Sequence, residues 1–175
     1  MSRRAHNGLR AGLAIALSLV TVACAAGRSD PREGMLAVAE QQRARYCDEE
    51  VERHAESVLR SVRSVEPLYV SVRSGKNSYY SRLLGARLWI PARQGMTTQW
   101  LERTLRCYEA DRTLRAGTAQ PAAPDPFWLP ESWVQIDVEP DRGGFVAVLR
   151  ANTVSEGAQV YARAQAFTAN AGSER

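Results

Sequence analysis

Apolar residues first recur at helical spacing between about residue 35 and residue 63. Cys47, Val51, Val58 and Val62 follow one another at intervals of four or seven residues, so they would share one face of a helix. Most charged residues of this stretch fall on the opposite side. Pro67 disfavours helical backbone in the residue before it. The pattern therefore predicts one long amphipathic helix that ends by residue 63.

A first β-β-α unit follows this helix. Residues 65–72 and 83–92 alternate apolar with polar side chains, as half-buried strands do, and a polar loop of about ten residues would join them as a hairpin. The next helical pattern covers about 98–115. Thr97 or Thr98 is the expected N-cap, because its hydroxyl can accept from the free backbone amides of the first turn.

A second unit repeats this plan. Residues 132–140 and 145–151 predict another hairpin, closed by a glycine-rich turn. Thr153 and Glu156 have the spacing of a capping box, which begins a last helix over about 154–168.

These elements predict an α+β fold in which an N-terminal helix precedes the two β-β-α units. We expect an antiparallel sheet of about four strands with the helices on one face. The whole of 35–168 would be a single domain, since 175 residues hardly suffice for two. Residues 117–132 contain four prolines and no periodicity, which indicates a connector between the units. Residues 169–175 are expected to be a polar tail.

The N-terminal part of the sequence has the three regions of an export signal. A basic segment is followed by an apolar stretch of about 16 residues, below the roughly 20 that a membrane-spanning helix needs, and then by small residues. We predict a signal peptide over 1–23 and a flexible tether over 24–34.

Residues 21–24, Thr-Val-Ala-Cys, resemble the lipobox of bacterial lipoproteins, although Thr21 stands where leucine is usual. The resemblance implies that Cys24 is lipidated and becomes the first residue of the mature protein. Since Ala25 follows Cys24, it also implies an outer-membrane lipoprotein that faces the periplasm or the surface. Ala23-Cys24-Ala25 also matches an A-x-A cleavage site, so a soluble periplasmic or secreted protein is the alternative.

Charge is uneven along the chain. The net charge of +4 falls to +1 without residues 1–23, which hold three arginines and no acid, whereas residues 57–115 hold 11 basic and four acidic residues, a net of +7. This basic region also contains Tyr79, Tyr80 and Trp89. It predicts a surface for anionic envelope components; the residues of this surface would be Arg73, Lys76, Arg82, Arg87 and Arg93. The alternative is compensation within the fold by the acidic segments on either side. We expect no nucleic-acid partner, because an exported protein rarely meets one.

Two cysteines remain once Cys24 is lipidated or removed. Exported proteins meet an oxidising compartment, so we predict a structural disulfide between Cys47 and Cys107; reactive thiols are the alternative. His54 lies seven residues after Cys47, which raises a weaker hypothesis of a metal- or redox-handling site built from Cys47, His54 and Cys107. A lone histidine is more often structural, so we expect no metal and no cofactor.

Several short motifs resemble those of uncharacterised bacterial envelope proteins. They are Gly85-Ala86 in a strand, the turn Gly95-Met96-Thr97, the helix segment 100–103 (Trp-Leu-Glu-Arg) and Cys107. Those proteins carry Cys-His where this chain has Cys107-Tyr108, which weakens the metal hypothesis. The resemblance implies no activity.

The sequence lacks the residues and motifs that nucleophilic catalysis usually requires. The sequence has no G-x-S-x-G motif, and His54 is the one histidine outside the export signal. We therefore predict a lipid-anchored cell-envelope protein with a binding or structural role rather than an enzyme. Its expected partners are the membrane, through the anchor, and anionic envelope components. The sequence makes no prediction of oligomeric state.

Overall fold

A computed structural model of the chain describes residues 31–116, 121 and 123–173; the predicted signal peptide and Cys24 lie outside this part. The elements, in chain order, are α1 (Pro31–Tyr46), α2 (Glu49–Leu59), β1 (Ser64–Arg73), β2 (Tyr79–Pro91), α3 (Thr98–Ala116), β3 (Gln135–Asp141), β4 (Gly144–Arg150) and α4 (Val154–Ser173).

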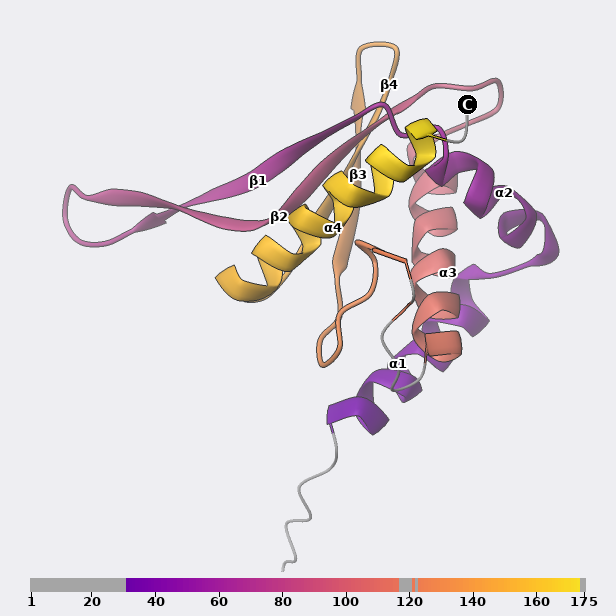
Figure 1. The fold of residues 1–175 in the computed structure, drawn as a ribbon, viewed down its shortest axis with the longest axis horizontal. Coiled ribbons are helices and arrows are strands. Elements are labelled where there is room, and N and C mark those ends of the chain that lie inside the picture. The colour runs from indigo at the N-terminus through magenta and orange to yellow at the C-terminus, as the bar shows by residue number, and fades with distance from the viewer. Residues whose placement is uncertain (1–30, 117–120, 122, 174–175) are drawn as a thin grey trace, which may run out of the picture.

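The four strands form one antiparallel sheet in the order β1-β2-β4-β3, so the two hairpins lie side by side (Figure 1). The contact between the hairpins is made by β2 and β4, which pair from Gly85–Arg150 to Pro91–Gly144. β1 and β3 are the sheet edges. The predicted α+β fold with two β-β-α units is confirmed.

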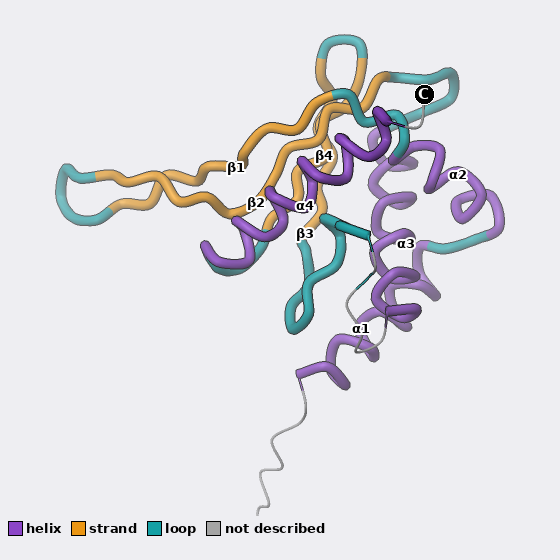
Figure 2. Tube along the Cα trace, in the orientation of Figure 1, coloured by secondary structure: helices purple, strands orange, loops and turns teal. Residues whose placement is uncertain are grey.

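The core lies between one face of this sheet and the helices. Buried apolar side chains of α2, α3 and α4 meet those of the strands in a single cluster, which includes Leu59, Leu88, Leu105, Leu149 and Val160. α3 and α4 therefore cover one face of the sheet, as expected, and α2 completes the core. α1 packs along α3 (Figure 2).

The prediction of one long helix over 35–63 is wrong, because the chain breaks between α1 and α2. Asp48 has extended backbone (φ −145°, ψ 172°), and its side chain accepts a hydrogen bond from the amide of Val51 at 2.9 Å. It is thus the N-cap of α2, and three glutamates in the first turn favour the positive end of the helix dipole. Cys47 consequently lies in the junction between two helices, not on the face of one.

Other boundaries also differ from the expected ones. α1 begins at Pro31, so the last four residues of the predicted tether are helical, and the rest of it lies outside the described residues. β2 begins at Tyr79, which leaves a loop of 74–78 in place of about ten residues. α4 continues to Ser173 through most of the predicted tail. Its capping box is confirmed, since the Glu156 amide donates to the Thr153 hydroxyl and the Thr153 amide donates to the Glu156 carboxylate.

β1 and β2 extend past the end of the neighbouring strand β4. β4 pairs with β2 only as far as Gly85, so residues 69–83 extend beyond the sheet as a two-stranded ribbon, which we call the hairpin arm (Figure 1). The arm begins at a β-bulge, where the register shifts between Leu68 and Tyr69. Gly85 has φ +154° there, and a Cβ on it would lie 1.9 Å from the carbonyl oxygen of Leu149. Because bulges bend and twist a strand, this irregularity directs the arm away from the body.

Candidate functional site

The hairpin arm combines exposed tyrosines with cations and contains no acid. Tyr69, Tyr79 and Tyr80 are 60%, 67% and 46% exposed. Arg73 and Lys76 lie at the tip and Arg82 on β2, all three exposed. No aspartate or glutamate occurs between residues 67 and 101. The arm therefore carries three positive charges, and no acidic residue of the same segment neutralises them.

The register places these residues on both faces of the ribbon. Opposite residues in an antiparallel pair share a face. Val70 pairs with Arg82 and Val72 with Tyr80 on one face. On the other face Tyr69 pairs with Leu83 and Arg73 with Tyr79. Each face of the arm thus carries at least one tyrosine, one cation and one aliphatic residue.

The tip of the arm is held by its own hydrogen bonds. The amide of Ser74 donates to the carbonyl of Ser78 at 2.8 Å. The guanidinium of Arg73 donates to the carbonyls of Gly75 and Lys76 at 2.8 and 2.7 Å. These acceptors are neutral, so the bonds orient the guanidinium and leave its positive charge uncancelled.

The other two predicted surface residues lie elsewhere. Arg87 forms an ion pair with Glu139 across the sheet at 3.2 Å, and Arg93 donates to the carbonyl of Ser57 at 3.2 Å. Internal compensation, the alternative raised by the sequence, therefore applies to Arg87. Lys76 and Arg82 form no ion pair with any described residue. Trp89 lies on the body of the sheet rather than on the arm, and packs on Leu68, Val146 and Val148 on the sheet face away from the helices. Val70, at the base of the arm, packs against the same cluster.

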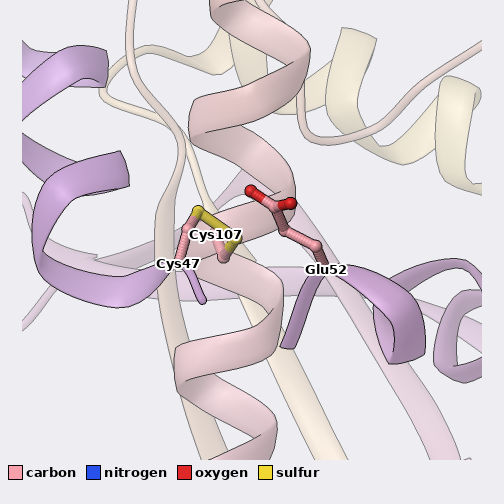
Figure 3. A group of neighbouring side chains, drawn as sticks. All are labelled: Cys47, Glu52 and Cys107. Carbon is pink, nitrogen blue, oxygen red and sulfur yellow. A yellow bond between two sulfur atoms is a disulfide. The ribbon is translucent and has the colours of Figure 1, made fainter. Parts of the chain in front are cut away.

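The predicted disulfide is present. Cys47 and Cys107 are bonded, with their Cα atoms 5.0 Å apart, and link the α1–α2 junction to α3 (Figure 3). Arg103 strengthens the same junction: it donates to the carbonyl of Tyr46 at 2.9 Å and pairs with Asp48. The bond uses both sulfur atoms, so neither is a thiolate that could bind a metal.

A carboxylate lies beside this disulfide, but the histidine does not. An oxygen of Glu52 and the two sulfur atoms all lie within 4.8 Å of one another (Figure 3), and the carboxylate is 3.6 Å from the guanidinium of Arg43. His54 instead lies with its Nδ1 2.7 Å from the carbonyl oxygen of Glu50 and its ring 5.9 Å from that of Trp100. The structure thus does not bring together the three residues of the metal hypothesis.

A groove of about 720 Å³ runs between α2 and α3 next to the disulfide. Its charges are largely paired within the chain, as in Arg60–Glu56 and Arg115–Asp111. Arg112 pairs with Asp125, which is almost completely buried. We therefore assign the groove no ligand.

The burial of two acidic residues, Asp125 and Glu109, was not predicted from the sequence. Asp125 accepts hydrogen bonds from Tyr108, Arg112 and the amide of Phe127, and so fixes the connector against α3. Burial, with the charge of Asp125, raises the pKa of Tyr108 above its ordinary value. Glu109 is 1% exposed; burial raises the pKa of its carboxyl, while the amide of Val134 donates to it at 2.9 Å. The run Pro-Asp-Pro-Phe was the one sequence signal for Asp125, since aspartate often caps a turn.

Comparisons with protein-family models, curated protein sequences and solved structures find no match to this chain. Within the described residues, no helix combines the length and the apolar character that crossing a bilayer requires. The class that the fold and the site define is thus an α+β domain, closed by one disulfide, with a protruding cationic hairpin.

Proposed function

We propose that this chain is a cell-envelope protein, held at the membrane by a lipid on Cys24, that binds an anionic envelope component through the hairpin arm. The role is binding rather than catalysis. The main observation behind this proposal is the composition of the arm, where three exposed tyrosines and three cations lie in a segment without acids.

The electrostatics of the arm support this role. Charges in water are screened over about 8 Å at physiological ionic strength, so what matters is the charge close to the contact surface. On the arm this local charge is positive, although residues 24–175 as a whole carry only +1. A positive surface of this kind attracts an anionic partner without making the protein strongly basic overall.

Two measurements test the proposal. For the anchor, the intact mass of the exported protein should equal that of residues 24–175 plus the acyl and glyceryl groups. Cys24→Ser should abolish that added mass and release the protein from the membrane fraction. If Cys24→Ser leaves both the mass and the membrane location unchanged, the anchor part of the proposal is wrong.

For the arm, the exported protein should bind isolated anionic envelope fragments in a salt-sensitive manner. The double variant Lys76→Gln, Arg82→Gln should bind them more weakly. The matched control is Arg53→Gln, Arg142→Gln, which removes the same charge from exposed positions outside the arm. Equal losses in the two variants would show that overall charge, not the arm, governs binding.

A soluble periplasmic or secreted binding module is the second candidate. It is favoured by the A-x-A sequence Ala23-Cys24-Ala25. An unacylated exported protein cleaved after Ala25 would establish it, and the role of the arm would be the same.

A further inference from the structure

Building on the proposed function, we infer that the anionic partner of the hairpin arm is the headgroup layer of a phospholipid membrane, into which the tip of the arm inserts. The alternative partner with the same charge is an anionic wall or surface polymer. The distribution of side chains around the ribbon distinguishes the two.

A polymer chain lying on a ribbon contacts one face of it. A binding platform for such a chain would therefore gather its aromatic residues on that face. In the arm, Tyr80 lies on one face while Tyr69 and Tyr79 lie on the other. A headgroup layer surrounds an inserted ribbon from both sides, so it can accommodate tyrosines on both faces at once.

The residue types also fit the membrane interface. Tyrosine is enriched at the headgroup level, because its ring is apolar and its hydroxyl can remain hydrated. Val72, half-buried and nearer the tip than Val70, adds apolar surface on the face that carries Tyr80, whereas Val70 packs against the sheet body. Lysine and arginine side chains can extend from such a site to the phosphates while their aliphatic parts stay in the less polar layer.

The geometry of the arm allows this contact before the body of the domain is reached. The arm leaves the sheet at the bulge and ends at the turn 74–78, far from the helices (Figure 1). Lys76 is in that turn, with Arg73 and Tyr79 on the strand residues directly beside it. The first part of the protein to meet a surface along this direction therefore carries charge and an aromatic ring together.

The test measures partition of the full exported protein onto two kinds of vesicle. One is phosphatidylcholine alone, and the other contains about a third phosphatidylglycerol. A lipid on Cys24 would bind both kinds equally, so the ratio of the two partition coefficients reports the charge-dependent part of binding, and the arm variant measures the share of the arm. Each cation near an anionic surface contributes about fivefold, so Lys76→Gln, Arg82→Gln should lower the ratio by about 25-fold.

Two further variants complete the test. Arg53→Gln, Arg142→Gln should leave the ratio nearly unchanged. Tyr79→Ser, Tyr80→Ser should weaken binding to the anionic vesicles although it alters no charge. These positions are exposed, and unchanged thermal unfolding will show that the variants fold.

The outcomes separate this inference from the proposed function. If the arm variant binds anionic vesicles as wild type does but loses binding to anionic envelope polymer, the membrane inference is wrong and the proposed function stands. If it loses neither, both are wrong. An arm-dependent ratio supports both.

Discussion

Removing the disulfide should strongly destabilise the domain. The two cysteines are 60 residues apart in sequence, and a bond closing a loop of that length stabilises by about 4 kcal/mol in the chain-entropy model. A domain of this size has a free energy of unfolding of about 5–15 kcal/mol. We therefore expect Cys47→Ser, Cys107→Ser to remove a quarter or more of that stability and to lower the Tm by about 15 °C.

The loss should be greatest at the α1–α2 junction. Apart from the disulfide, the junction is held to α3 by Arg103 and by Arg106, whose guanidinium lies 5.6 Å from the ring centroid of Tyr46. Such partly exposed contacts contribute about 1 kcal/mol or less each. Amides of α1 should therefore exchange with solvent much faster in the double variant. The protection of amides in the central strands should fall only by the loss in the global free energy of unfolding.

Urea unfolding with and without reductant provides the assay. The wild-type protein should lose about 4 kcal/mol on reduction, and the double variant should be insensitive to it. Thiol labelling of the oxidised, folded protein without reductant should leave Cys47 and Cys107 unmodified. Labelling of either residue, or equal unfolding curves for oxidised and reduced wild type, would refute the reasoning.

Three further predictions test individual features of the fold. Burial raises the pKa of Glu109, so the folded carboxyl keeps a proton that the unfolded chain loses above about 4.5; stability should fall as pH rises above that value, by at most about 1.4 kcal/mol per pH unit. Glu109→Gln should flatten this profile in urea unfolding, and an unchanged profile would contradict the assignment. Gly157→Ala should destabilise by about 1–3 kcal/mol, because its Cβ would lie 2.6 Å from the backbone of Leu84; a rise in Tm would show that the helix does not approach so closely. Thr153→Ala should cost about 1 kcal/mol through loss of the N-cap of α4, measured as a lower urea midpoint. Glu156→Ala should lower the midpoint further in that background, because the backbone amide of residue 153 then loses the carboxylate that accepts from it.

Elements that bury one face could be predicted from the sequence. The alternation of Ala86, Leu88 and Ile90 located the core face of β2, and all three are buried. The capping box located the start of α4 because its two side chains are local in sequence. The disulfide prediction followed from the expected export of the chain and from the small number of cysteines, without any knowledge of the fold.

Exposed or locally broken segments could not be predicted in the same way. Both faces of the arm are solvated, so Tyr79, Tyr80 and Arg82 show no alternation, and their strand character comes only from pairing with β1. The break before Asp48 was hidden because apolar residues on either side of it keep helical spacing. Its signal was the run of acids after Asp48, which is typical of a helix N-terminus.

Net charge along a segment also proved insufficient to define a surface. All five predicted cations lie in the acid-free stretch 67–101, yet the fold separates them. Arg87 meets Glu139 because β2 and β3 both flank β4, although these residues are 52 positions apart in sequence. Lys76 and Arg82 stay uncompensated because the arm extends past β4 and β3, where the acids of the second hairpin cannot reach them. Whether a cation belongs to the proposed binding surface thus depends on where the sheet ends. A variant with a shortened arm and an unchanged charge should therefore bind anionic vesicles as weakly as Lys76→Gln, Arg82→Gln.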